Sequence, residues 1–326
     1  MSTAAQCVRF DRDDPLAGLQ VGSVPEIEPA PGWVRVEVRA AALNGHDLWS
    51  LRGVGLTGSD LPRTLGSDAA GVVTDSRRRV VVYPAVSVSP PETTEQLDPR
   101  VSPLLSERHD GTLADAVLVP EYALLDLPSH LSFEQAATLP TAWLTAYRML
   151  FVLGAVRPGS TVLVQGATGG VSTALTTLAS RAGVHVWVVT RSEKGKAWAL
   201  EQGADAVFSE DERLPHRVDT VMETVGESTW AHSLRSLRVG GRLVVAGATS
   251  GGNPGAALQR VFFHQLQIIG ARLGTLSEFR ALLRFIEEQA IVPPVDCVLP
   301  LSQTRLALAR LQTGGLRGKI VIRPGA

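Results

Sequence analysis

Residues 160–183 read STVLVQGATGGVSTALTTLASRAG, and this stretch decides the fold. A short apolar run, Val162–Val164, is followed by Gly166, Gly169 and Gly170, and then by a stretch with no charge before Arg181. Glycines between a strand and a helix let the backbone approach a pyrophosphate, whose charge the helix N-terminus attracts. Many βα turns carry glycines for geometry alone, so the motif by itself is weak evidence for a dinucleotide site. The strands and helices around it are the stronger evidence.

The surroundings are a series of strands and helices. We expect strands at residues 184–189, 206–208, 218–223 and 242–246, with helices around GKAWALEQGAD and over residues 229–237. Strands that alternate with helices of about ten to fifteen residues indicate a parallel sheet covered on both faces. The sequence therefore predicts an α/β fold, with a doubly wound Rossmann dinucleotide-binding domain over residues 122–262.

Composition excludes several classes of protein. The 326 residues carry a net charge of −1, which gives no basic field for nucleic acid. Two distant cysteines, Cys7 and Cys297, form neither a disulfide framework nor a metal motif. The N-terminus lacks a signal-peptide pattern and no apolar run approaches bilayer length. We expect a soluble cytoplasmic protein with no nucleic-acid or membrane partner.

The two ends of the chain differ from its middle. Residues 1–121 contain short alternating apolar runs, such as Trp33–Val38 and Val80–Tyr83, separated by glycine and proline as in an antiparallel barrel. Residues 132–153 are helical, with Ser132 as N-cap. Residues 263–326 return to short strands around a helix. We expect both ends to form one substrate domain, with the substrate cleft between the two domains.

Several motifs match one family in order and spacing. They are AALNGHDLWSLRG (41–53), PRTLGSDAAGVV (62–73), LPTAWLTAYRML, the glycine loop, LEQGAD, VGGRLVVAGATSGG (239–252) and GKIVIRP. The chain resembles the medium-chain dehydrogenase/reductase superfamily, specifically its zinc-free quinone oxidoreductase (zeta-crystallin-like) branch. The resemblance implies a GroES-like antiparallel β-barrel domain beside the Rossmann domain, and a homodimer paired through residues 267–270.

The resemblance also bears on metal. Zinc-dependent members carry a cysteine and a histidine where this chain has Asn44 and Ser67, and the third ligand position, near Thr141, is not a cysteine. The region of the structural zinc lobe, 84–108, contains no cysteine. Because zinc needs closely grouped Cys, His or carboxylate ligands, we expect neither zinc site.

The expected cofactor is NADPH, with NADH as the weaker alternative. Where NAD enzymes place an acidic residue after the second strand, this chain has Thr190-Arg191-Ser192, then Lys194 and Lys196. An arginine fork and a second cation suit a 2′-phosphate, although mixed charges also open many surface helices. The predicted cofactor-binding residues are Gly166, Ala167, Thr168, Gly169, Gly170, Val171, Thr190, Arg191, Lys194, Lys196, Gly247, Ala248 and Thr249.

Without a metal, catalysis must depend on hydrogen-bond donors. Asn44 offers an amide, and His46 is either a proton donor or a solvent-facing loop residue. Asp47 is expected to hold the loop by accepting backbone N–H groups. Trp49 lines a substrate slot or packs as core, and Thr141 lines the substrate by resemblance only.

Two classes of function fit these features. The first is an NADPH-dependent oxidoreductase that transfers hydride to an activated C=C bond or a quinone without metal. The second is a non-redox protein on the same scaffold, a cyclase or a cofactor-sensing protein, which retains NADP(H). A metal-dependent alcohol dehydrogenase is disfavoured because its ligands are absent.

Overall fold

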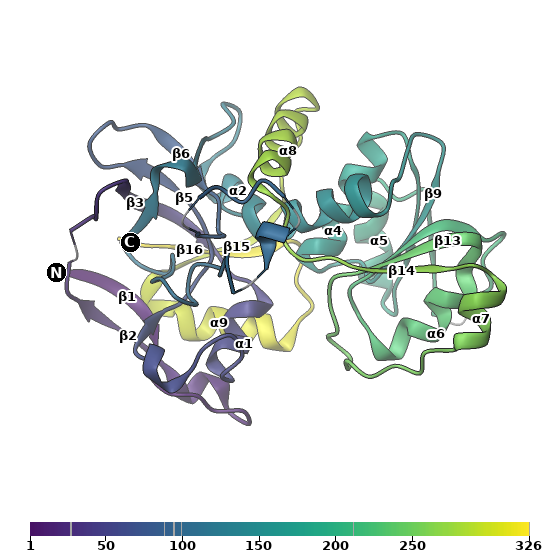
Figure 1. The fold of residues 1–326 in the computed structure, drawn as a ribbon, viewed down its shortest axis with the longest axis horizontal. Coiled ribbons are helices and arrows are strands. Elements are labelled where there is room, and N and C mark those ends of the chain that lie inside the picture. The colour runs from purple at the N-terminus through teal and green to yellow at the C-terminus, as the bar shows by residue number, and fades with distance from the viewer. Residues whose placement is uncertain (27, 88, 94, 99, 211, 326) are drawn as a thin grey trace. The chain divides into compact units, whose positions relative to one another are not determined.

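The computed structural model describes residues 1–26, 28–87, 89–93, 95–98, 100–210 and 212–325 (Figure 1). The chain divides into two compact units, one made of Met1–Thr141 with Thr275–Ala326 and the other of Ala142–Gly274. The functional boundaries after residues 121 and 262 stay a prediction. No helix among the described residues is long and apolar enough to cross a membrane.

The second unit is built on a parallel sheet. Its strand order is β11-β10-β9-β12-β13-β14, and every neighbouring pair is parallel. The strands are β9 (Thr161–Gln165), β10 (His185–Val189), β11 (Ala206–Phe208), β12 (Val218–Glu223), β13 (Leu237–Val245) and β14 (Gln267–Gly270). The helices are α3 (Leu144–Tyr147), α4 (Gly170–Arg181), α5 (Glu193–Glu201), α6 (Glu227–Ser236) and α7 (Leu258–Phe263). This topology confirms the predicted Rossmann fold.

The first unit is mainly antiparallel. Its larger sheet runs β15-β16-β3-β5-β6-β8 with β7 also on β3, and its smaller sheet runs β2-β1-β4. The strands are β1 (Ser2–Cys7), β2 (Leu19–Val24), β3 (Trp33–Ala42), β4 (Arg63–Thr64), β5 (Asp68–Val73), β6 (Arg79–Val82), β7 (Ala116–Pro120), β8 (Leu124–Asp126), β15 (Val295–Pro300) and β16 (Lys319–Arg323). Since β16 pairs with β3, both ends of the chain build this unit, as the predicted GroES-like architecture requires.

The helices of the first unit are α1 (Gly45–Leu51), α2 (Phe133–Ala136), α8 (Leu276–Glu288) and α9 (Thr304–Thr313). Short 3₁₀ turns cover Pro15–Gly18, Gly58–Asp60, Glu95–Leu97, Glu121–Ala123 and Leu301–Gln303, and π-helical turns cover Leu139–Trp143 and Arg148–Leu153. The stretch predicted as helical over 132–153 is therefore helical with π turns. Ser132 caps it, because its hydroxyl accepts from the Gln135 N–H at 3.2 Å.

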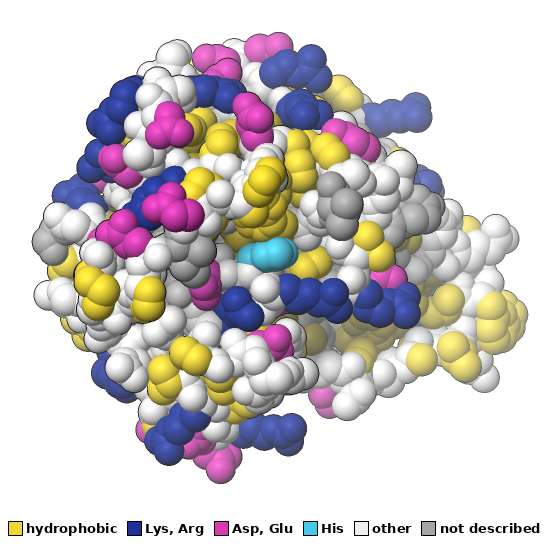
Figure 2. Space-filling model, turned by 60° about the vertical axis from the view of Figure 1, so that its left-hand side comes forward, with side chains coloured by type: hydrophobic (Ala, Val, Ile, Leu, Met, Phe, Trp, Pro, Cys, Tyr) yellow, Lys and Arg dark blue, Asp and Glu magenta, His cyan; other side chains and the backbone are white. Residues whose placement is uncertain are grey.

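Two further features bear on the sequence. Phe262 and Phe263, in the motif FFHQLQIIG, fit either the core or a dimer edge by sequence, and they are 60% and 74% exposed. The polar turn around His109 predicts a surface position, but His109 is half-buried and its ring lies 4.9 Å from that of Trp33. Figure 2 shows positive and negative side chains interspersed over the visible face, in keeping with the net charge of −1.

Candidate functional site

Strand register brings three distant polar residues together in the first unit. Ala42 on β3 pairs with Asp68 on β5 on one side and with Val321 on β16 on the other. The next backbone bond runs from Leu43 N–H to Ile320 O at 3.0 Å. Asn44, Asp68 and Lys319 therefore converge at the ends of these strands, inside the unit.

These three residues form a buried polar network with Ser67 and Thr141. The Asn44 amide nitrogen donates to Asp68 Oδ2 at 2.9 Å and to Ser67 Oγ at 3.3 Å. Lys319 Nζ donates to Asn44 Oδ1 and lies 3.5 Å from Asp68 Oδ2. The Thr141 hydroxyl donates to Asp68 Oδ1. Thr141 is half-buried and the other four are buried, so Thr141 is the accessible end of the network.

Asp47 fixes the loop on which Asn44 lies. Its carboxylate accepts from Asn44 N–H at 2.8 Å and from Gly66 N–H at 3.0 Å, and Asn44 with Asp47 forms the capping box of α1. Burial raises the pKa of Asp47 to about 6, although the two backbone donors oppose that change. The carboxylate thus ties the loop after β3 to the loop before β5.

Burial also changes the ionisation of the other two charged members. It raises the pKa of Asp68, against the opposing effects of Lys319, Thr141 and Asn44. It lowers the pKa of Lys319, against the opposing charges of Asp68 and Asp47. One ammonium and two carboxyl groups therefore lie together in a buried site, where an ionised group without a partner would carry a large desolvation cost.

The remaining predicted residues on α1 are His46 and Trp49, which follow Asn44 in the chain. His46 Nε2 lies 3.6 Å from Glu107 Oε1 and 3.5 Å from Ser50 Oγ. His46 and Glu107 are both only partly accessible, with side chains 15% and 13% exposed. Trp49 is 41% exposed, which leaves its ring available for contact with a ligand.

The glycine turn of the second unit fits a pyrophosphate. Gly166 has φ +83°, a conformation that side chains rarely adopt. At Gly169, the N-cap of α4, a Cβ atom would meet nothing closer than 3.9 Å, and no side chain caps the helix. The first N–H groups of this twelve-residue helix therefore have no side-chain cap, and the glycines before it leave room for a ligand. Ala167, Thr168, Gly170 and Val171 complete this turn and the start of α4.

The cations predicted for the 2′-phosphate already have carboxylate neighbours. Arg191 Nε lies 3.5 Å from Glu210 Oε1, and Lys196 Nζ lies 2.9 Å from Glu193 Oε1. Lys194 is exposed, and among the described residues no ion pair involves it. The side chain of Arg191 is 84% exposed, so it is free to turn from Glu210 to a ligand.

A buried glutamate at the end of β12 shapes the third coenzyme segment. Glu223 accepts from the N–H groups of Val225 and Gly226 and from the hydroxyls of Thr229 and Ser233. This turn packs on residues 247–251, where the predicted Gly247, Ala248 and Thr249 lie. A Cβ on Gly247 would come within 2.6 Å of Thr224 O, so the two loops approach backbone to backbone.

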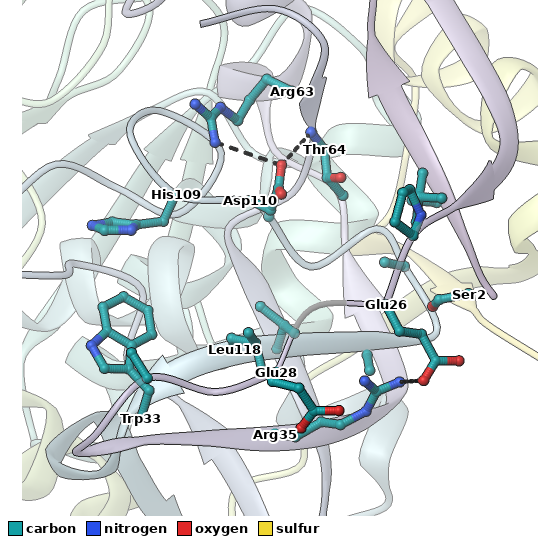
Figure 3. Close-up of a pocket in the computed structure, with 18 of the residues that line it drawn as sticks. Ser2, Glu26, Glu28, Trp33, Arg35, Arg63, Thr64, His109, Asp110 and Leu118 are labelled. Atoms are coloured by element: carbon teal, nitrogen blue, oxygen red, sulfur yellow. Dashed lines mark hydrogen bonds and ion pairs between the residues drawn. The ribbon is translucent and has the colours of Figure 1, made fainter.

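A separate cavity of about 360 Å³ lies in the first unit (Figure 3). Figure 3 shows Trp33 and His109 at the left of the cavity, Arg63 with Asp110 above, and Glu26 with Ser2 at the right. Burial lowers the pKa of His109, and Arg63 Nη1 lies 3.6 Å from Asp110 Oδ1. None of the predicted catalytic residues lines this cavity.

No metal cluster is present in the described part of the chain, where no three His, Cys, Asp or Glu side chains group together. The positions that zinc enzymes use for ligands hold Asn44, Ser67 and, nearby, Thr141. The Lys319 ammonium lies among these side chains, so a divalent cation there would meet a like charge.

Sequence reasoning missed three residues of these sites. Lys319 lies in the quoted GKIVIRP motif and Asp68 in PRTLGSDAAGVV, but neither motif indicates that the two side chains meet. Glu223 has a local signal, because Thr229 and Ser233 follow it with the i, i+4 spacing of one helix face.

Comparison with known proteins gives consistent matches. Residues 30–129 match the family model described as alcohol dehydrogenase GroES-like domain, and residues 170–288 match zinc-binding dehydrogenase. A crystal structure of an NAD-dependent alcohol dehydrogenase is 32% identical, with a TM-score of 0.90 over 99% of this chain and 100% of that one. The acryloyl-coenzyme A reductase of Sulfurisphaera tokodaii is 27% identical over 95% of this chain and 98% of its own. The quinone oxidoreductase of Mus musculus is 28% identical over 90% of both chains.

Proposed function

The chain belongs to the medium-chain dehydrogenase/reductase superfamily, and we propose that it is a metal-independent, NADPH-dependent reductase of activated C=C bonds or quinones. The observation that carries the proposal is the buried network of Asn44, Asp68, Thr141 and Lys319. It supplies an ammonium and hydroxyl groups where zinc-dependent relatives supply metal ligands. Two relatives that are named as an acryloyl-coenzyme A reductase and a quinone oxidoreductase support the same reaction class.

The coenzyme is proposed to bind along three segments of the second unit. Residues 166–171 receive the pyrophosphate, residues 190–196 the adenosine end, and residues 247–249 border the coenzyme. When bound, the coenzyme supplies a hydride. Arg191 presents a planar fork to a 2′-phosphate, and its exposed pair with Glu210 is weak enough to be replaced by that ligand.

The residues of the first unit then act on the substrate. Asn44 is held through its amide by Asp68 and Ser67, so its role is to fix the network. The role proposed for His46, whose ring pairs with the Glu107 carboxylate, is to donate a proton to a carbonyl oxygen of the substrate. Asp47 keeps this loop in position, while Trp49 and Thr141 line the substrate. Preorganised donors of this kind stabilise charge as it develops on the substrate oxygen.

The test is a turnover assay with metal analysis. Purified protein is mixed with NADPH or NADH and a panel of quinones, enones and enoyl thioesters, and absorbance of the reduced coenzyme is followed. We expect oxidation of NADPH in chelator-treated protein. Tight coenzyme binding without oxidation by any acceptor would favour the non-redox alternative. Stoichiometric zinc that activity requires would contradict the metal-free proposal.

We also propose that two copies pair through β14. This strand is the edge of the parallel sheet, and exposed apolar side chains lie on and near it: Val239, Leu258, Phe262, Phe263 and Ile268. Figure 2 shows hydrophobic side chains gathered at the end of the second unit on its right. Unpaired edges and apolar patches favour association. Phe263→Asp should convert a dimer to a monomer in light scattering, whereas wild-type protein that is already monomeric would contradict this pairing.

A further inference from the structure

We propose that Lys319 is the proton source of this reductase, and that its proton reaches the substrate through the Asp68 carboxyl and the Thr141 hydroxyl. The inference rests on the proposed function, because reduction of a conjugated C=C bond requires one proton at carbon in each turnover. A positioned acid for that proton contributes about 10²- to 10⁴-fold to the rate. The described residues of the network supply one.

The contacts form a continuous path. Lys319 Nζ lies 3.5 Å from Asp68 Oδ2, and the Thr141 hydroxyl is hydrogen-bonded to the other carboxyl oxygen, Oδ1. The two oxygens of one carboxyl group thus connect the ammonium to the hydroxyl. Lys319 is 6% exposed and Asp68 is fully buried, whereas Thr141 is half-buried. A substrate can therefore reach the path only at Thr141.

Charge balance indicates where the proton resides. Asp47, Asp68 and Lys319 are all buried, so the electroneutral cluster has one ammonium, one carboxylate and one protonated carboxyl. Asp47 accepts two backbone N–H bonds, which favour its ionised form. We take Asp68 as the protonated member, a state that burial favours and that the donors Lys319, Thr141 and Asn44 oppose. In the structure the Thr141 hydroxyl donates to Oδ1. In the protonated state proposed here, Oδ1–H donates to Thr141 instead, and the hydroxyl hydrogen is then available to the substrate.

The step balances without a change of oxidation state. The Thr141 O–H bond breaks as a C–H bond forms, with the electron pair of the substrate enolate. The Asp68 Oδ1–H proton passes to Thr141 Oγ1, and the Lys319 Nζ–H proton passes to Asp68 Oδ2. Thr141 ends as it began, Asp68 ends with its proton on Oδ2 in place of Oδ1, and Lys319 ends as a neutral amine. After the product leaves, a proton from solvent passes along the same path in reverse, from Thr141 to Asp68 Oδ1 and from Asp68 Oδ2 to Lys319, which restores the starting state.

The residue type supports a role in releasing a proton. Only three of the 31 basic residues in this chain are lysines, and the other two are Lys194 and Lys196. Arginine remains charged at all relevant pH values, whereas a buried lysine changes its protonation readily.

The first experiment separates charge from proton release. Lys319→Arg keeps the cation but cannot release a proton, and Thr141→Val keeps the shape but removes the hydroxyl. Thr138→Val is the matched control, because the Thr138 hydroxyl donates to Gln135 O at 2.8 Å and, among the described residues, makes no bond to the network. Each protein is assayed with NADPH and 3-penten-2-one, which needs a proton at carbon, and with 1,4-naphthoquinone, whose product oxygens take protons from water.

We expect Lys319→Arg and Thr141→Val to slow the enone reaction by about 10²-fold or more and the quinone reaction far less, while Thr138→Val changes neither rate. The wild-type enone rate should fall as alkaline pH removes the proton of the pair, and Lys319→Arg should lose this dependence. If both variants keep the wild-type enone rate and pH profile, the relay is overturned while the reductase stands. If wild-type protein fails to oxidise NADPH with either the enone or the quinone, the proposed function is wrong, and the relay is then wrong as well.

A second readout needs neither coenzyme nor substrate. Protein labelled at lysine Nζ with ¹⁵N gives at most three side-chain signals, and the signal lost in Lys319→Arg, or in Lys319→Gln if the arginine variant does not fold, belongs to Lys319. We expect the Lys319 signal to titrate below the ordinary pKa of a lysine, because burial lowers its pKa, with a midpoint that moves in Thr141→Val. Titration of Lys319 at the ordinary pKa of a lysine would overturn the proposal.

Discussion

The two units of this protein hold their charged side chains in opposite ways. In the first unit, Asp47, Asp68 and Lys319 are buried and joined through Asn44 at the ends of three strands. In the second, Arg191 and Glu210 form an ion pair whose side chains are 84% and 41% exposed. A buried charge carries a desolvation cost that its partners must offset, whereas water screens an exposed pair.

The difference teaches which charges are fixed and which can move. Removal of one partner from the buried network leaves another charge without compensation, so the network is expected to be rigid. The exposed pair can exchange one partner for another at little cost, which suits a segment that must receive a ligand. The four predictions that follow test this contrast, beginning with the largest effect.

Lys319→Met should give the largest loss of stability. The substitution leaves Asp47 and Asp68 buried without their cation, and breaking a buried pair costs about 3–5 kcal/mol. Urea unfolding of the apoprotein measures the loss. Lys196→Met is the comparison, because its pair with Glu193 lies at the surface, and its unfolding midpoint should match wild type. Equal midpoints for the two variants would show that the buried network contributes no more than a surface pair.

Asp47 should make stability depend on pH in a defined direction. Below about pH 4 its carboxyl is protonated in both folded and unfolded chains. The folded pKa is about 6 against an ordinary 3.8, so the folded chain must carry a buried charge as pH rises further. Stability is therefore present at low pH and lost as pH rises through 6, by about 3 kcal/mol at ~1.4 kcal/mol per pH unit.

Asp47→Asn isolates this effect. The amide does not ionise, so wild type should lose stability relative to the variant between about pH 4 and about pH 7. The variant also turns a donor toward one of two backbone N–H groups, which adds a cost that does not change with pH. Urea unfolding across this range measures the difference. A difference that stays constant with pH would mean that water reaches the Asp47 carboxylate.

The sequence predicted the second unit better than the first because its signals are local. Parallel strands read as continuous apolar runs, and residues 206–208 and 218–223 were predicted with the bounds that the structure has. The glycine turn before α4 is equally local. The ion pair of Arg191 has no local signal in the sequence, because its partner Glu210 comes from the loop after β11.

The network of the first unit could not be predicted in this way. Lys319 donates to Asn44 across 275 residues of chain, and no local pattern encodes that contact. The pKa of Lys319 is lowered by burial, and that burial depends on how β16 pairs with β3. The exposure of Phe262 and Phe263 has a similar origin, since residue type alone does not distinguish a core from an uncovered sheet edge.

Arg191→Ala tests the exposed region directly. Removal of the guanidinium should lower the preference for NADPH over NADH by about tenfold, as loss of a charge-assisted bond to a phosphate requires. The ratio of kcat/KM for the two coenzymes measures it. Lys194→Ala is the matched variant, and it should change the ratio less because a single ammonium lacks the bidentate fork. An unchanged ratio in both variants would place the adenosine end elsewhere.

Glu210→Gln should give the smallest effect and the opposite sign. In wild type, Glu210 competes with the coenzyme phosphate for Arg191, with its oxygen 3.5 Å from the guanidinium nitrogen. The neutral amide keeps the size of the side chain but removes the competing charge, so NADPH should bind about two- to fivefold more tightly, as for loss of an exposed pair. Affinity for NADH, which lacks the 2′-phosphate, should stay the same. Titration of coenzyme fluorescence at low and high salt measures both, and the gain should shrink at high salt because ions screen exposed charges. A gain for NADH equal to that for NADPH would mean that Glu210 acts on the whole coenzyme and not on its phosphate.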